Sequence, residues 1–556
     1  MNRPMRQGPH GIMGKKPKLE KDTIKFVTRR TWEYLKKYPW NLFVVIISII
    51  LTALFNLALP TVIKIFIDNH IDSQVLDLSS VLVIVLGIAG GSFIIGIFSY
   101  FQTFLMAKAA SKATKQIRKD AFDKLTNLPI KYFDQNIHGD IMSKLTNDVD
   151  AISNALSQVI PQLITTIISL TGAIVLMFIT SWQLSLIALF IIPFALIGTV
   201  IIIRKGNRHY GAQQEAIGQI NGIVEEDVSG LQVIKLYNQE QVMIDKFNKV
   251  NKSLKKSSFK AQIYTGLMMP VIRLVDNILY GILVSLGAIL NIKLGIITVG
   301  EIQAMTQYAR MATRPITNLA QVFSALQIAI AGGDRVYKLM DEQDEHVGEI
   351  SNNIENPKGE IEFKNVRFRY SEDEEVIKGI SFKAKAGQTV AIVGPTGSGK
   401  TTIINLLARY YDVNSGEVLF DGVNINSISK DFLRSQVGIV LQTTYLFKGT
   451  IMENIRYGKP DASDAEVIQA AKLAQVHDII ERLPKKYRTK VREGGENFSH
   501  GERQLISIAR TILYNPLILV LDEATSSVDT RTESKIQKSM ELLTQNRTSF
   551  ELIIPY

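Results

Sequence analysis

Long apolar stretches dominate the first part of the chain. Six of them are long enough for a bilayer crossing, which takes ~20 residues. They lie at 40–66, 79–106, 157–180, 183–204, 263–291 and 300–328, and the sixth is the least hydrophobic. This pattern predicts a membrane domain of six helices over residues 22–330.

Two segments precede the first span. Residues 22–38 carry apolar side chains at helical spacing, from Ile24 to Tyr38, with lysine and arginine between them. The spacing predicts an amphipathic basic helix lying on a membrane surface, although an ordinary solvated helix has the same pattern. Residues 1–21 are rich in basic residues, Gly and Pro and lack the apolar core of a signal peptide, so we expect a disordered basic tail.

The polar connections predict the orientation. The segments after the second and fourth spans, 107–155 and 205–262, are long and rich in Lys and Arg, whereas the other connections are short or nearly free of them. The positive-inside rule therefore predicts a plasma-membrane protein with both termini in the cytoplasm. Helices of about 22 residues in these segments would extend ~33 Å beyond the bilayer. Such stalks either transmit force between a cytoplasmic domain and the membrane or are simple helical hairpins.

Few ionisable residues interrupt the spans. Among them are Lys64, Arg273, Asp276, Arg310 and Arg314. Arg273 and Asp276 are three residues apart on one helical face, so they either line a substrate path or form an internal ion pair. Arg310 and Arg314 are compatible with the cytoplasmic part of the sixth span.

After a polar, acidic stretch at 331–358 that we interpret as a linker, the pattern changes to that of an α/β domain over 359–556. The apolar run 390–393 is typical of a buried parallel strand, and 402–407 of the first turns of a helix. A phosphate-binding loop between them consists of Gly394, Pro395, Thr396, Gly397, Ser398, Gly399, Lys400 and Thr401. Lys400 is suited to the β- and γ-phosphates of a nucleotide, and the Thr401 hydroxyl to Mg²⁺. Thr402 is also assigned to the nucleotide site.

Two further polar positions follow apolar runs in this domain. Asp522 and Glu523 end the run 517–521, and Gln442 follows 438–441. An acid at a strand end beside a phosphate-binding loop is suited to Mg²⁺, which makes Asp522 a metal candidate. Glu523 is the candidate general base for an attacking water, and Gln442 is a candidate for contact with Mg²⁺ or that water.

The composition agrees with this picture. The net charge of +11 suits either nucleic acid or a membrane surface, and the six spans make nucleic acid unnecessary. The chain has no cysteine, so disulfides and thiolate metal sites are excluded.

Several motifs resemble those of the ATP-binding cassette (ABC) exporter half-transporters, and the resemblance covers nearly the whole chain. Phe498–Gln504 resembles the family signature, and Leu521–Asp529 its Walker B and D-loop run. Tyr370 resembles the aromatic residue that stacks on adenine, and Arg492–Glu496 the X-loop. Gly139–Asp150 resembles the first cytoplasmic loop, and the stalk tips match the coupling helices.

The resemblance implies a mechanism. Two cassettes pair head to tail around two ATP molecules, so Ser499 and Gly501 would contact nucleotide held by the partner chain. The stalks would then convert closing and opening of the cassettes into outward- and inward-facing membrane states. The implied cargo is an amphipathic small molecule, lipid or peptide.

Two departures from the family pattern bear on activity. The signature has His500 and Glu502 where Gly and Gln are usual, which suits one half of a heterodimer as well as a homodimer. The sequence reads Glu551–Tyr556 where the family continues to its switch histidine, which predicts an incomplete cassette. Two functions stay open: an ATP-hydrolysing exporter, and a nucleotide-binding membrane subunit with impaired hydrolysis.

Overall fold

The computed structural model describes residues 20–71, 78–346, 354–372, 374–395, 397–441, 444–522 and 530–553. The chain forms two compact units. The helical unit contains Met1–Leu125 and Gly139–Asp341, and the cassette unit contains Thr126–His138 and Glu342–Tyr556. The small insert Thr126–His138, which carries helix α4 (Ile130–Gln135), therefore belongs to the cassette unit although its neighbours in sequence do not.

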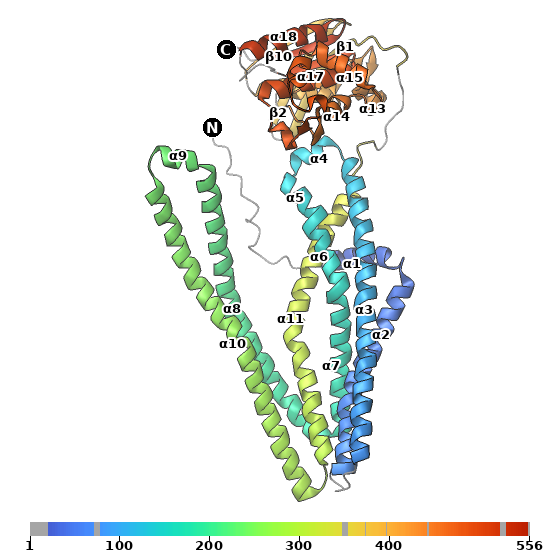
Figure 1. The fold of residues 1–556 in the computed structure, drawn as a ribbon, viewed down its shortest axis with the longest axis vertical. Helices are drawn as coiled ribbons and strands as arrows, with labels where there is room; N and C mark the ends of the chain where they lie inside the picture. Colours follow the sequence, from blue (N-terminus) through green and yellow to red (C-terminus); the bar gives the residue numbers. More distant parts are fainter. Residues whose placement is uncertain are drawn as a thin grey trace. The chain divides into compact units, whose positions relative to one another are not determined.

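Long helices build the helical unit (Figure 1). The α-helices are α1 (Lys21–Leu35), α2 (Pro39–Phe66), α3 (Leu78–Thr126), α5 (His138–Ser143), α6 (Val149–Asn154), α7 (Ile160–Thr180), α8 (Trp182–Ser229), α9 (Leu231–Leu236), α10 (Glu240–Leu294) and α11 (Val299–Asp341). Three π-helical turns, η1 (Ile67–Ile71), η2 (Lys144–Asp148) and η3 (Ala155–Val159), continue their neighbours. Each predicted span falls within one of α2, α3, α7, α8, α10 and α11, except that the first three residues of the third span lie in η3.

Hydropathy identifies four of the six long segments as candidate membrane spans. Within the described residues, Pro39–His70, Leu78–Thr126, His138–Thr180 and Glu240–Leu294 are long and apolar enough to cross a membrane. The fourth predicted span lies in α8, where most side chains from 191 to 203 are outside the described residues. The sixth lies in α11, which is amphipathic instead of uniformly apolar.

One face of α11 forms the core of the helical unit. Ala304, Met305, Tyr308, Ala309 and Ala312 are all buried there against α2, α7, α8 and α10. The Tyr308 hydroxyl donates to the Leu57 carbonyl of α2 at 2.8 Å, because a buried phenol needs a polar partner. Small residues on this face let the neighbouring helices approach closely, as is common between membrane helices.

The helices α8 and α10 pack side by side as a long hairpin with α9 at its tip (Figure 1). The tip is unusually apolar for an exposed turn: the exposed fractions of Val233, Leu236 and Tyr237 are 59%, 73% and 66%. An exposed apolar group of this kind marks an interaction surface.

The predicted amphipathic helix is present as α1, and it packs on the end of α11. Val27 and Leu35 are its buried positions, Thr31 and Tyr337 share a hydrogen bond of 2.9 Å, and Arg30 pairs with Asp341. Because these contacts hold α11 helical as far as Asp341, the linker predicted from 331 begins later than we expected.

Two four-stranded sheets form the cassette unit. Their strands are β1 (Ile361–Ser371), β2 (Glu374–Ala384), β3 (Thr389–Val393), β4 (Ser415–Phe420), β5 (Val423–Asn424), β6 (Val437–Val440), β9 (Ile518–Asp522) and β10 (Thr548–Ile553). One sheet is antiparallel with the order β2-β1-β4-β5, and the other is parallel with the order β3-β10-β9-β6. A short pair, β7 (Gly449–Thr450) and β8 (Lys490–Val491), lies apart from both.

The cassette unit also contains helices, of which α13 and α17 contact β6. They are α12 (Lys400–Leu407), α13 (Lys430–Gln436), α14 (Ile451–Arg456), α15 (Asp464–Leu473), α16 (His477–Glu481), α17 (His500–Tyr514) and α18 (Thr530–Thr544), with 3-10 turns η4 (Ile425–Ser427), η5 (Lys486–Arg488) and η6 (Glu493–Gly495). Alternate residues of β9 enter different cores: Ile518 and Val520 one, Leu519 and Leu521 the other. Burial on both faces explains why β9 reads as a continuous apolar run.

Candidate nucleotide-binding site

The predicted phosphate-binding loop joins β3 to α12. Gly397 and Gly399 have φ angles of 88° and 92°, which side-chain-bearing residues rarely adopt. A Cβ atom on Gly399 would lie 2.8 Å from Ile377 Cδ1, and one on Gly394 would lie 2.6 Å from Ser398 Oγ. Gly394 and Gly399 therefore have no room for a side chain, and Gly397 is held to glycine by its φ angle alone. A glycine-rich turn of this kind fits a cradle for phosphate oxygens.

Lys400 and Thr401 begin α12 directly after the glycines. The Lys400 ammonium donates to the carbonyl oxygens of Gly394 and Pro395 at 2.6 and 2.9 Å. The lysine side chain therefore connects the end of the loop to its beginning. Thr401 is exposed at the start of the helix, whereas Thr402 is buried. An ammonium and a hydroxyl at a helix N-terminus fit a polyphosphate.

The strand register brings Asp522 to the same edge of the sheet. Leu552 of the central strand β10 pairs with Ile392 of β3 on one side and with Asp522 of β9 on the other. Adjacent strands lie about 4.8 Å apart, so Asp522 lies ~10 Å from the end of β3. This is the carboxyl edge of a parallel sheet, where nucleotides bind in α/β folds.

Tyr370 lies near the end of β1 and is 41% exposed. Its hydroxyl donates to Thr402 Oγ1 at 3.2 Å and accepts from Asn405 Nδ2 at 3.1 Å, which fixes the ring beside α12. The ring also meets Tyr411 edge to face, with 4.9 Å between centroids. A cavity of 370 Å³ adjoins both tyrosines.

Tyr411 connects this aromatic pair to α4. Its hydroxyl donates to Asp134 Oδ2 at 2.6 Å. Burial and this bond to a carboxylate raise the pKa of Tyr411, so the phenol stays protonated as the donor at neutral pH. Tyr411 lies in no motif, so the sequence gives no sign of this contact.

The signature residues form the start of α17. Ser499 is the N-cap residue: its Oγ accepts from the Glu502 N–H at 3.3 Å, and Glu502 Oε2 accepts from the Ser499 N–H at 2.8 Å. Glu502, one of the departures from the family signature, therefore completes a capping box. Gly501 is buried in the first turn, and no hydrogen-bond partner is described for the buried Nδ1 atom of His500.

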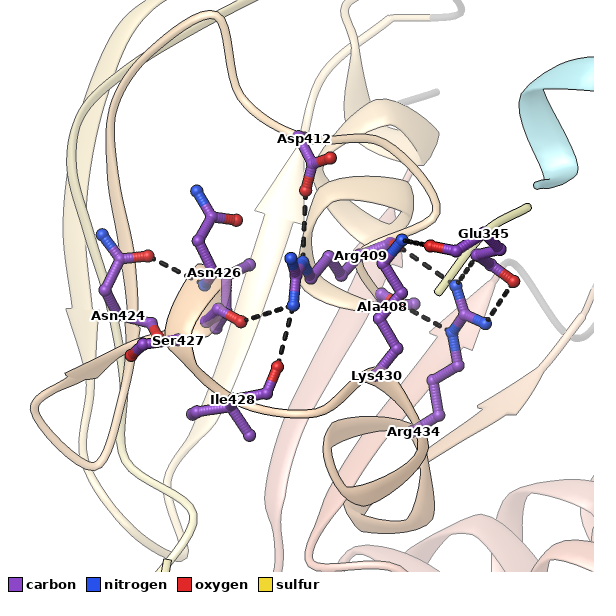
Figure 2. Close-up of polar contacts among 11 residues, drawn as sticks. Glu345, Ala408, Arg409, Asp412, Asn424, Asn426, Ser427, Ile428, Lys430 and Arg434 are labelled. Carbon is purple, nitrogen blue, oxygen red and sulfur yellow. Dashed lines mark hydrogen bonds and ion pairs between the residues drawn. The ribbon is translucent and has the colours of Figure 1, made fainter. Parts of the chain in front are cut away.

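A polar clasp holds the other end of α12 (Figure 2). Arg434 of α13 donates to both carboxylate oxygens of Glu345, at 2.6 and 3.1 Å. It also donates to the carbonyls of Ala408 and Arg409, which follow α12, at 3.2 and 3.1 Å. Lys430 adds a bond to the Glu345 carbonyl at 2.7 Å.

The clasp is charge-compensated and continues into the core. Burial alone would raise the pKa of Glu345, but the hydrogen bonds and charge of Arg434, with Lys430, lower it below its usual value. Arg409 is buried and donates to the carbonyls of Ile425 and Ile428 at 2.9 and 2.8 Å (Figure 2). Its φ of 49° ends the helix. The sequence showed Glu345 only as part of an acidic linker.

Three predicted site residues, Thr396, Gln442 and Glu523, lie outside the described residues. Among the described residues there is no group of three or more His, Asp or Glu side chains arranged to hold a metal ion.

Both units match models of known families. Residues 42–316 match the ABC transporter transmembrane region, and residues 377–526 match the ABC transporter model. In the structural comparison, a bacterial Atm1-family ABC exporter with ATP bound is similar, with a TM-score of 0.72 and 28% identity over 93% of this chain and 91% of that one.

Sequence relatives agree. The ABC transporter ATP-binding protein YfiC of Bacillus subtilis is 40% identical over 96% of this chain and 88% of its own length. A fatty acid ABC transporter ATP-binding/permease protein of Mycobacterium bovis is 40% identical over 81% of this chain and 71% of its own. A probable multidrug resistance ABC transporter, YheH of Bacillus subtilis, is 34% identical over 84% of this chain and 70% of its own.

A helical membrane unit and a nucleotide cassette in one chain define an exporter-type half-transporter. The chain belongs to the ABC transporter family, and the predicted fold class is confirmed. It is an integral membrane protein whose cassette binds ATP and couples ATP hydrolysis to export. As a half-transporter it works as a dimer.

Proposed function

We propose that the chain exports amphipathic small molecules, lipids or peptides across the plasma membrane, with both termini in the cytoplasm. One observation carries this proposal. The same chain contains helices long enough to span a bilayer and a phosphate cradle at the carboxyl end of β3. The basic connections between spans support the orientation. Relatives named for fatty acid and multidrug transport support an apolar cargo.

We assign the ATP chemistry to residues of the cassette. Lys400 binds the β- and γ-phosphates, the backbone of residues 394–399 surrounds them, and Tyr370 stacks on adenine. Thr401, Asp522 and Gln442 are assigned to Mg²⁺, which would neutralise developing charge on the phosphates when bound. Glu523 orients and deprotonates the attacking water.

We assign the second half of each ATP site to a partner chain. Ser499 and Gly501 begin α17, where backbone N–H groups and the helix dipole favour an anion presented from outside. The exposed apolar tip around α9 supports burial against a partner half. Because Glu502 itself completes the capping box that begins α17, a homodimer and a heterodimer are both compatible with the site.

The alternative function is a nucleotide-binding membrane subunit with impaired hydrolysis. The residues His500 and Glu502 in the signature favour it, because they adjoin Ser499 and Gly501, which we assign to nucleotide held by the partner. An exporter and an impaired subunit differ in turnover and not in ATP binding.

Turnover measurements on the purified full-length chain in lipid discs separate these two functions. For the exporter, we expect ATP hydrolysis well above that of the Glu523→Gln variant, with equal nucleotide binding in both. Equal, background-level hydrolysis in the two proteins would refute the exporter. Adding a candidate sister half and recovering turnover would identify a heterodimer.

A further inference from the structure

The face of α11 opposite its core is polar at bilayer depth. Gln303, Gln307 and Arg310 follow one another at intervals of four and three residues, so they lie on one face of the helix. Gln307 and Arg310 are exposed, whereas Ala304, Tyr308 and Ala309 on the core face are buried. A lipid-facing helix does not carry such a stripe, because polar groups in hydrocarbon are costly.

A hydrogen-bonded cluster marks the end of α11 at the bilayer boundary. Asp68 Oδ1 accepts from the Gly300 N–H and Asp68 Oδ2 from Thr298 Oγ1, at 2.8 and 2.9 Å. Lys64 pairs with Glu301 at 2.9 Å in the next turn. Arg310 lies about three helical turns beyond Val299, or ~16 Å, which is near the middle of a ~30 Å hydrocarbon core.

Among the described residues, the charge at this depth is net positive, because Arg273 and Arg310 outnumber the single carboxylate of Asp276. Arg310 Cζ lies 5.2 Å from the centre of the Tyr280 ring of α10, a contact that leaves the N–H groups of the guanidinium available. Within the described residues neither Arg310 nor Arg273 pairs with a carboxylate. Asp276 instead accepts from Thr313 Oγ1 of α11 at 3.0 Å, so of the two alternatives for Arg273 and Asp276 the internal ion pair is not the one observed.

We propose that this α11 face, centred on Arg310, binds the acid group of an amphipathic anion, a carboxylate or phosphate carried on an apolar tail. The guanidinium fork matches either oxyanion, the glutamine amides add donors, and Tyr280 holds the fork in position. Arg273, near the opposite membrane boundary, attracts the same charge on entry. The inference rests on the proposed export function and specifies its cargo.

Binding of three probes with one tail tests the charge preference. Oleate, oleyl alcohol and oleylamine are titrated into the full-length chain in phosphatidylcholine discs. We expect oleate to bind at least about tenfold more tightly than the alcohol, as a charge-assisted hydrogen bond allows, and the amine to bind least well. R310Q should remove the preference, R310K should keep part of it, and K293Q, at the end of α10, should keep all of it.

Each outcome decides the inference. Equal affinities of the three probes for the unaltered chain, or an oleate preference that survives R310Q, would overturn it. Unchanged binding of oleyl alcohol to R310Q shows that the variant is folded, and R310K provides a second check. Lysophosphatidate in place of oleate tells a phosphate-bearing cargo from a carboxylate-bearing one.

A separate measurement keeps the two proposals apart. ATP turnover is followed in the same discs with no added probe. Turnover at the level of Glu523→Gln would refute the exporter while leaving the probe affinities readable. Robust turnover with no acid preference would refute the anion site alone.

Discussion

At the scale of single residues, the two ends of α12 are fixed by different chemistry. Lys400 begins the helix and closes the phosphate loop on its own carbonyls, while Arg434 satisfies the carbonyls of Ala408 and Arg409 at the other end. The motif around Lys400 was readable from the sequence because its spacing is local. The clasp was not, because Glu345 and Arg434 meet only after folding.

Lys400→Ala should weaken ATP binding by at least about tenfold, since an ammonium–phosphate contact is a charge-assisted bond. Fluorescent-nucleotide titration of the purified chain measures the change. Lys385→Ala, at an exposed position in the same unit, is the matched control and should bind normally. Normal affinity in Lys400→Ala would contradict the site assignment.

Glu502→Ala should destabilise the cassette unit by about 0.3–1.5 kcal/mol, because it removes one half of the capping box. Glu502→Gln keeps an acceptor at the same place and should lose less. Urea unfolding monitored in the cassette unit compares the two variants. Equal stability of both variants and the parent chain would contradict a capping role.

At the scale of elements, the spacing of apolar residues explains where helices α1 and α11 begin and end relative to the predictions. The helix expected at 22–38 is observed as α1 because its apolar spacing buries Val27 and Leu35. The linker expected from 331 was placed too early, since Val336, Tyr337 and Leu339 are buried and extend α11 to Asp341. Length and hydropathy alone do not identify the polar face of α11, whose partner residues come from α10.

The clasp between Glu345 and Arg434 should weaken in acid. The pKa of Glu345 is lowered in the folded protein, so the clasp's stabilisation is complete above the ordinary pKa of a glutamate, about 4.3, and is lost as the pH falls through the lowered value. Protection factors at the end of α12, which correct hydrogen exchange for its intrinsic pH dependence, should therefore fall in acid below about pH 4.3.

Glu345→Gln supplies the comparison for this pH dependence. The variant should exchange faster at neutral pH, with a loss of about 1.5–3 kcal/mol in local stability, and should respond less to acid. An identical pH profile in the parent chain and the variant would rule out the clasp as the titrating contact.

At the scale of the whole molecule, much of the surface is suited to surroundings other than water. Apolar side chains are exposed along α2 and α3, as bilayer contact requires. A second group is exposed around α9, in the polar connection between the predicted fourth and fifth spans. Sequence hydropathy identified the first group as spans. It gave no sign of the second, because isolated apolar residues in a polar helical hairpin resemble ordinary surface residues.

The tip around α9 should become protected when two halves assemble. The chain has no cysteine, so Val233→Cys provides a single thiol whose maleimide labelling can be followed. We expect labelling to slow severalfold in the dimer, while Lys293→Cys at the end of α10 labels at one rate throughout. Constant labelling of Val233→Cys in monomer and dimer would exclude the tip from the interface.

The position of β10 has a consequence for biosynthesis. It lies between β3 and β9 but follows both in the chain, so those two strands share no ladder until residues 548–553 leave the ribosome. Until then the sheet has two facing, unpaired edges, and the phosphate loop lacks the backbone bond from Gly394 to Ile553. A nascent cassette without that strand therefore exposes two unpaired strand edges, which favour pairing with other chains.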